Sequence, residues 1–419
     1  MRFCMITTFY PPYNFGGDGI SIERLVHMLA RQGHEVDVIH CVDSFNTLTN
    51  RRLPPVLSQS KPGVTVHSLA SGVGMLSPLA TYLTGYPFFK GKKIRSILAS
   101  KRFDVIHFHN ISLIGGPKIL KYGEAIKLYT MREHWLICPT NVLFKFKREA
   151  CNKKACFRCQ LAYRRPPQLW RYTPMLDQAL KHVDAFIAQS EFTLKRHIAD
   201  RPGMPIVRIP NFVTEPAEEP YVSMGNHLPL PNRPFFLFVG RLEKLKGLQT
   251  IIPLFKHYRK ADLVIAGDGD YARELKKLAG NSPGIHFLGN VLRADLHGIY
   301  AQAIAVLVPS ITFEVFPNII MEAHAAKTPV IVRDLGSLPE AVAESGGGLV
   351  FHNHEDLLDA MELLFNNPEL RKSLGEAGYR TYRSQWTEEA YLERYLKLIE
   401  DVRLRKQGIQ ELTPNLVEV

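Results

Sequence analysis

Short apolar runs alternate with amphipathic stretches along most of this chain. In the second half, each apolar run is followed closely by Gly, Pro, Ser or Asp, and a stretch of helical composition separates it from the next. This alternation predicts βαβ units that build a parallel sheet. The expected strands lie within 235–240, 261–270, 284–291, 304–310 and 329–340, and the expected helices lie within 248–258, 271–279, 294–303 and 318–327.

The first half of the chain repeats this rhythm, so we expect another α/β domain there. The segment 20–33 is amphipathic and closes with a glycine, which predicts a helix between the first two strands. A further amphipathic helix is expected over 388–405, near the end of the chain. The expected strands of the first half are Arg2–Phe9, Glu35–Val42, Val64–Leu69, Asp104–His109, Ile126–Met131, Ala185–Gln189 and Val207–Ile209.

A length of 419 residues favours two domains of ordinary size. Proline-rich sequence near the middle predicts a linker over 211–232, between a first domain over 1–210 and a second over 233–385. No apolar run approaches the length of a membrane-spanning helix, and the first residues predict a strand rather than a signal peptide. We therefore expect a cytoplasmic protein in a reducing setting.

Two carboxylates, Glu314 and Glu322, lie eight residues apart just beyond the apolar run 304–309. Pro317 is expected to be the first residue of the following helix. Glu314 would then lie in the loop at the carboxyl end of a strand, and Glu322 more than a turn into the helix. Open α/β sheets bind ligands at this edge, and a helix N-terminus there favours a diphosphate. The two carboxylates suit sugar and ribose hydroxyls, although glutamates at this spacing are also common on ordinary helix surfaces.

Two cations, Arg241 and Lys246, follow the first expected strand of the same domain. They would lie on the rim that carries Glu314, where two cations beside a helix N-terminus make a diphosphate site. In the first domain, a loop that contains Gly16 and Gly17 follows the first strand and can bring backbone N–H groups to a phosphate. This loop lacks the G-x-G-x-x-G spacing, so no dinucleotide cofactor is expected.

The motifs GRLEKLKG, AGDGD, FLGNV and FEVFPNIIMEA follow one another over 235–340. In this order they resemble the donor half of glycosyltransferase family 4, while the glycine-rich loop, DVIHFHN and EHWLICP resemble its first half. The resemblance implies the GT-B fold, in which two Rossmann-like, doubly wound α/β domains face each other across a cleft. It also implies a retaining sugar transfer that needs no catalytic metal, and a C-terminal helix over 386–407 that packs back towards the first domain.

The resemblance assigns roles on the donor side. Arg241 and Lys246 would neutralise the departing nucleoside diphosphate. Glu314 would hold hydroxyls of the transferred sugar, and Glu322 would hold those of the ribose. The expected donor is a UDP- or GDP-sugar, and the expected acceptor is lipid-linked, a polysaccharide or a small molecule. Backbone amides would contact the donor at Gly16, Gly17, Val315 and Phe316.

The acceptor side departs from the family pattern. Aligned on Trp135, the position of the usual histidine is taken by Arg132, and His134 takes the position of an aromatic residue. Either His134 takes over the role of facing the sugar, or Arg132 fills it differently, or the acceptor differs, or the activity is weakened. His109 is another candidate near the site, although a single histidine at a strand end is more often structural.

Four of the six cysteines fall within a basic, aromatic insertion over 138–172 of the first domain. Four thiols this close in a reducing setting predict a metal, most simply a structural zinc. An iron–sulfur cluster, a disulfide and free thiols are the alternatives. A metal there would hold the insertion in place and take no part in the reaction. The four are Cys138, Cys151, Cys156 and Cys159.

The net charge of +12 favours an anionic partner. Residues 145–171 hold nine Lys and Arg against one acid, Glu149, and residues 81–103 also mix aromatic with basic side chains. This composition suits an anionic membrane surface or single-stranded nucleic acid. Because no nucleic-acid-binding motif accompanies it, we expect a peripheral membrane enzyme or an anionic acceptor, and no nucleic acid.

The leading interpretation is a retaining hexosyltransferase of polysaccharide biosynthesis. The alternative is a metal-stapled GT-B binding protein, inactive or weakly active, for a lipid surface or nucleic acid. Arg132 and the basic insertion support this alternative, whereas the intact donor-side cations and glutamates count against it. A nucleotide-sugar epimerase or hydrolase is a rival within enzymes, and the glutamate pair argues against the epimerase. The sequence does not specify the sugar, nucleotide, acceptor or linkage.

Overall fold

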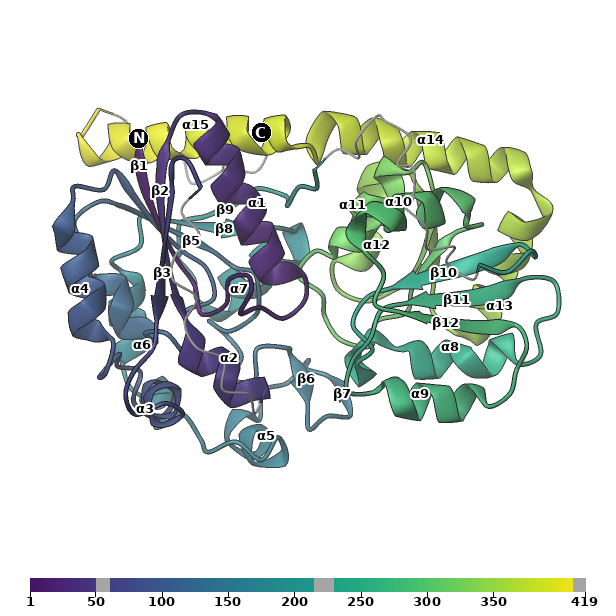
Figure 1. The fold of residues 1–419 in the computed structure, drawn as a ribbon, viewed down its shortest axis with the longest axis horizontal. Helices are drawn as coiled ribbons and strands as arrows, with labels where there is room; N and C mark the ends of the chain where they lie inside the picture. Colours follow the sequence, from purple (N-terminus) through teal and green to yellow (C-terminus); the bar gives the residue numbers. More distant parts are fainter. Residues whose placement is uncertain (50–60, 215–229, 410–419) are drawn as a thin grey trace. The chain divides into compact units, whose positions relative to one another are not determined.

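The computed structural model describes residues 1–49, 61–214 and 230–409. The chain divides into two α/β units (Figure 1). The first unit comprises Met1–Ile209 together with the C-terminal stretch from Leu392, and the second comprises Pro210–Tyr391. Residues 215–229, within the predicted linker, lie outside the described residues.

A seven-stranded parallel sheet forms the centre of the first unit, in the order β3-β2-β1-β4-β5-β8-β9. The order changes direction between β1 and β4, so the loops that follow these two strands diverge. All seven strands match the predicted segments to within a few residues. They are β1 (Arg2–Ile6), β2 (Glu35–Cys41), β3 (Val64–Leu69), β4 (Val105–Phe108), β5 (Ile126–Thr130), β8 (Ala185–Ala188) and β9 (Ile206–Arg208).

Helices flank this sheet, with α1 on one side and α4 on the other (Figure 1). A short antiparallel hairpin, β6 (Phe144–Lys145) and β7 (Glu149–Ala150), lies in the insertion between β5 and β8. The helices are α1 (Gly17–Arg31), α2 (Val42–Thr49), α3 (Leu76–Thr84), α4 (Gly91–Ser100), η1 (Pro117–Lys121), α5 (Cys156–Ala162), η2 (Leu169–Tyr172), α6 (Met175–Leu180) and α7 (Glu191–Asp200).

Helix α1 begins at Gly17, three residues before the predicted start at Ile20. Its preceding residue, Gly16, has a φ of 60°, a conformation that glycine adopts without strain. Gly16 has no side chain that could cap the helix. Asn14 takes this role instead, because its side-chain oxygen accepts the Gly19 N–H at 3.1 Å. The polar loop therefore extends the helix beyond its amphipathic part.

A six-stranded parallel sheet forms the centre of the second unit, in the order β12-β11-β10-β13-β14-β15. Strands β10 to β14 fall in the predicted apolar runs, whereas β15 was not predicted because its sequence is short and glycine-rich. The strands are β10 (Phe235–Val239), β11 (Asp262–Ala266), β12 (Ile285–Gly289), β13 (Val306–Val308), β14 (Val330–Arg333) and β15 (Gly348–Phe351).

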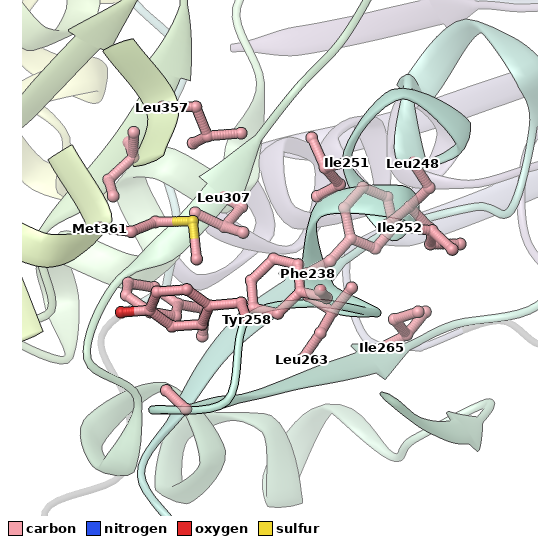
Figure 2. Packing of buried hydrophobic residues seen from close by; sticks show 14 of the residues in the cluster. Phe238, Leu248, Ile251, Ile252, Tyr258, Leu263, Ile265, Leu307, Leu357 and Met361 are labelled. Atoms are coloured by element: carbon pink, nitrogen blue, oxygen red, sulfur yellow. The ribbon is translucent and has the colours of Figure 1, made fainter. Parts of the chain in front are cut away.

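Alternate residues of these strands enter two separate cores, one on each face of the sheet. Phe236 and Phe238 enter one core, and Phe235 and Leu237 enter the other. Figure 2 shows part of the first core, where side chains from α8 and α13 pack against strand residues. The helices are η3 (Lys244–Lys246), α8 (Leu248–Phe255), α9 (Ala272–Ala279), α10 (Arg293–Gln302), α11 (Asn318–Ala325), α12 (Leu338–Ser345), α13 (His354–Asn366) and α14 (Pro368–Gln385).

The last described helix, α15 (Glu388–Lys406), contributes its residues from Leu392 to the first unit. Tyr395 is fully buried there, and its hydroxyl lies 2.8 Å from His107 Nδ1 on β4. Near the end of the helix, Lys406 pairs with Asp184 at 2.8 Å. No helix in the described part of the chain is long and apolar enough to cross a membrane.

Candidate active site

The two central strands of the second sheet lead into the residues predicted to contact a donor. Arg241 and Lys246 follow β10, and Ser310 and Glu314 follow β13. Lys246 Nζ donates a hydrogen bond to Glu314 Oε1 at 2.8 Å, and Ser310 Oγ donates to the same oxygen at 2.7 Å. The strand order changes direction between β10 and β13, so this pair lies at the switch point where open α/β sheets bind ligands.

The electrostatics of this rim keep Glu314 ionised at neutral pH. Burial raises the pKa of Glu314, but the Lys246 charge, hydrogen bonds from Lys246 and Ser310, and the Arg241 charge together lower it below the ordinary value. The Lys246 ammonium has three N–H donors and gives one to Glu314, which leaves two for a phosphate. The Arg241 guanidinium pairs with Glu243 at 2.7 Å and keeps about half of its side chain exposed.

The loop from Glu314 to helix α11 is held by its neighbours. Ser337 Oγ donates to the backbone oxygen of Glu314 at 2.9 Å, and the buried ring of Phe316 packs edge-on against Trp386 at 5.5 Å. Pro317 has an extended ψ of 123° and precedes the helix, so the prediction that it is the first helical residue is wrong by one position. Because Pro disfavours helical backbone in the residue before it, the loop stays extended up to this point.

Helix α11 places Glu322 on its second turn. The Tyr300 hydroxyl of α10 donates to Glu322 Oε2 at 3.1 Å, which orients the carboxylate. The amides of Val315 and Phe316 precede the helix N-terminus, whose dipole favours negative charge. The second unit therefore brings two cations, two carboxylates and one helix N-terminus to the same edge of its sheet.

In the first unit, the side chains of Arg132, His109 and Asp18 meet beyond the ends of β4 and β5. Arg132 Nε donates to His109 Nδ1 at 3.3 Å and lies 3.6 Å from Asp18 Oδ1 on α1. Burial, with smaller contributions from His107 and Arg132, holds the pKa of His109 well below its ordinary value. His109 is therefore neutral at pH 7, and because Nδ1 accepts, its proton is on Nε2. Gly16 and Gly17 lead into the same helix as Asp18.

The remaining candidate, His134, lies elsewhere in the first unit. Its buried ring packs against Phe192 and His197 of α7, with the His197 ring 5.9 Å away. Glu133 lies between Arg132 and His134 in the sequence. Burial, and to a smaller extent the Asp18 charge, raises the pKa of Glu133 to about 8, so this carboxyl is protonated at neutral pH. The placement favours Arg132 over His134 as the side chain that faces a ligand beside His109.

The four clustered cysteines line one small cavity in the insertion. Cys138 precedes the β6–β7 hairpin, Cys151 follows it, and Cys156 and Cys159 lie one turn apart in α5. All four are free thiols. Within 1–49, 61–214 and 230–409, however, no three His, Cys, Asp or Glu side chains form a preformed metal site. Four thiols in one cavity fit zinc by chemistry, and zinc would have to draw the sulfurs closer.

Three polar residues of the candidate site were not singled out from the sequence. They are Ser310, Asp18 and Glu133. Ser310 could have been found, because it directly follows an apolar run that ends at the ligand-binding edge. Asp18 and Glu133 carry no such signal. Their significance depends on the packing of α1 against the end of β5, which the sequence does not reveal.

Two family models match consecutive parts of the chain. The model described as "Glycosyltransferase Family 4" matches residues 15–215, and the model described as "Glycosyl transferases group 1" matches residues 224–381. A D-inositol 3-phosphate glycosyltransferase from Pseudarthrobacter chlorophenolicus is 26% identical over 402 residues, which cover 90% of this chain and 88% of the relative.

Solved structures match the fold over nearly the whole chain. Sucrose-phosphate synthase from Thermosynechococcus elongatus has a TM-score of 0.76 at 18% identity, covering 96% of this chain and 99% of that one. HepE from Anabaena, solved in complex with UDP-glucose, has a TM-score of 0.66 at 16% identity, covering 96% of this chain and all of that one.

Proposed function

Because this chain belongs to the family 4-like glycosyltransferases of the GT-B fold, we propose that it moves a sugar from a nucleotide-sugar donor, with UDP-glucose as the first candidate, to an acceptor with retention of anomeric configuration. HepE, which shares the fold, was solved with UDP-glucose, and this motivates the choice of nucleotide and sugar. Residence in the cytoplasm stays a prediction from the sequence.

The observation that carries the donor site is the Lys246–Glu314 pair beside Arg241 and the N-terminus of α11. As the bond to the sugar breaks, negative charge develops on the departing diphosphate. Two N–H donors of Lys246, the guanidinium of Arg241 and the amides near Val315 would stabilise that charge. These groups are already oriented, so little reorganisation is needed when the charge appears.

The two glutamates would hold the donor at its two ends. Glu314 is ionised and accepts hydrogen bonds only, so it would bind hydroxyls of the sugar while it orients Lys246. Glu322, oriented by Tyr300, would bind the ribose hydroxyls. In the first unit, the neutral His109 and the Arg132 guanidinium would contact the sugar or the acceptor, with Arg132 in the place of the family's histidine. We keep the three acceptor classes predicted from the sequence open.

The alternative of an inactive binding protein gains no support from the donor side. A site that only binds an anionic surface has no use for a largely buried carboxylate that orients a lysine. The basic insertion is compatible with an enzyme and with a binding protein. The glycosyltransferase function also explains the donor-side residues, so it explains more of the chain.

The test is a calorimetric titration with UDP, GDP, ADP and TDP, followed by the sugar-loaded form of any nucleotide that binds. We expect one nucleotide to bind saturably and Lys246→Ala to weaken it at least about tenfold, as loss of a charged hydrogen bond requires. Lys277→Ala, at an exposed lysine on α9, is the matched control. Failure of every nucleotide to bind folded protein would overturn the proposal. NMR of the transferred product then distinguishes retention from inversion.

A further inference from the structure

Helix α3 is amphipathic in the reverse sense to a helix that packs on a core. Its leucines Leu76, Leu79 and Leu83 follow the spacing i, i+3, i+7 and so share one face. These three side chains are 58%, 40% and 39% exposed. The face that packs inwards carries Ser77 and Thr81, which are almost fully buried. A soluble helix normally buries its leucines and exposes its hydroxyls.

Buried ionic contacts fix this orientation. Lys90 donates to Ser77 Oγ and pairs with Asp43 of α2 at 2.7 Å, and the Lys90 and Asp43 side chains are only 3% and 6% exposed. Asp43 also accepts from the Ser71 amide at 3.0 Å. Rotating α3 to bury its leucines would take the Ser77 acceptor away from the buried Lys90 ammonium, and an unmet hydrogen bond of a buried charge is unfavourable. The outward orientation of the leucine face is therefore set by the fold of the first unit.

Further exposed apolar side chains surround α3. The loop that follows it carries Phe88 and Phe89, which are largely exposed. η2 lies beside α3, because Trp170 Nε1 donates to the backbone oxygen of Tyr82 at 3.0 Å, and η2 exposes Leu169 and Tyr172. Scattered single hydrophobics need no explanation, but a gathering of this kind marks an interaction site.

The sequence segments that carry these side chains hold basic but no acidic residues. Residues 71–103 contain no Asp or Glu, and neither do residues 150–176. Exposed Lys92 and Lys93 lie in the first turn of α4, shortly after the two phenylalanines, and Lys118 lies over the Tyr86 ring at 4.9 Å. Leucine and aromatic side chains beside lysines are the composition of surfaces that insert into the headgroup region of anionic bilayers.

We propose that this apolar–basic surface, formed by α3, the loop 85–89, η2 and the start of α4, docks the enzyme on an anionic lipid bilayer. The leucines and phenylalanines enter the boundary between headgroups and acyl chains, and the lysines contact the acidic headgroups. Aliphatic leucines do not stack on bases, so a nucleic acid partner fits the surface less well. The inference goes beyond the proposed reaction, because docking does not depend on which sugar is transferred.

The test is flotation of the full chain with vesicles of pure phosphatidylcholine and of phosphatidylcholine containing phosphatidylglycerol. We expect binding to the anionic vesicles that weakens with salt. Leu76→Gln/Leu79→Gln/Leu83→Gln keeps the helix propensity of α3 and should weaken partitioning on the order of 100-fold. Leu292→Gln/Leu363→Gln, at exposed leucines of the second unit, is the matched control and should bind as the unaltered protein does.

A second variant separates charge from apolar insertion. Lys92→Gln/Lys93→Gln should weaken binding to anionic vesicles about 30-fold, from roughly 1 kcal/mol for each lysine. Lys277→Gln/Lys372→Gln is its control. Equal binding to both kinds of vesicle, or no binding to either, would overturn the proposal. A protein that is dimeric without lipid and becomes monomeric in the leucine variant would instead identify the surface as an interface between two copies.

Discussion

Glu314→Gln should destabilise the second unit by an amount that depends on pH. The Glu314 and Lys246 side chains are 16% and 27% exposed, so their pair lies between a surface pair, worth up to about 1 kcal/mol, and a fully buried pair, whose disruption costs about 3–5 kcal/mol. The amide oxygen of glutamine can still accept from Ser310, so only the charge is removed. We expect a loss of about 1–2 kcal/mol at pH 7.

The sign of the pH dependence follows from the lowered pKa of Glu314. A carboxyl whose pKa is lower in the folded state stabilises the protein above its unfolded pKa, about 4.3. This contribution is lost as the pH falls through the folded pKa. The unaltered protein should therefore lose its advantage over Glu314→Gln as the pH falls below about 4.3.

Thermal unfolding followed by circular dichroism at pH 7, 5.5, 4 and 3 measures the effect. A loss of this size lowers the melting temperature by roughly 2–8 °C in a unit of this length. Lys246→Met completes a double-mutant cycle, and the two changes together should cost less than their sum. A difference that is absent at pH 7, or equally large at pH 7 and well below pH 4, would refute the reasoning.

Three further outcomes follow from the site geometry. Glu322→Ala should raise the Kd of the bound nucleotide roughly 10- to 100-fold in calorimetry, because charged hydrogen bonds to the ribose are lost; an unchanged Kd would contradict that role. Arg132→Gln should let the pKa of His109 rise part of the way to its ordinary value in an NMR titration, since burial is the larger cause of its depression. Protein prepared without chelators should contain about one zinc per chain by mass spectrometry, and Cys156→Ser should lower this; four thiols that react freely with Ellman's reagent would contradict it.

The alternation of apolar runs predicted both parallel sheets, because buried strands read as continuous apolar segments whatever their neighbours are. The ends of strands were less well predicted. The strand predicted as Glu35–Val42 ends at Cys41, because α2 begins at Val42, and β13 spans only Val306–Val308 of the predicted run. Hydrogen bonding to neighbouring strands decides where a strand ends, and a single run does not carry that information.

The donor side was more predictable than the acceptor side. Lys246 and Glu314 follow strands that share one sheet edge, so sequence position brought them together. Arg132 and Asp18 come from elements that meet only through packing around α1, and the burial that protonates Glu133 is a property of the folded unit. The reversed orientation of α3 depends on the contact of Ser77 with the buried Lys90 and had no signal in the helical pattern.

Helix α15 belongs largely to the first unit but is synthesised after the second unit. The chain leaves this unit at Ile209 and returns to it only at Leu392, whose helix adds the buried side chains of Tyr395, Ile399 and Val402 to its core. At about 5–20 residues per second, a ribosome needs roughly 10–40 s to produce the intervening stretch and this helix. During that time the first unit is translated only as far as Ile209 and lacks its last helix, and the second unit, which ends at Tyr391, is completed before that helix. The domain that is synthesised first is therefore the one that finishes folding last.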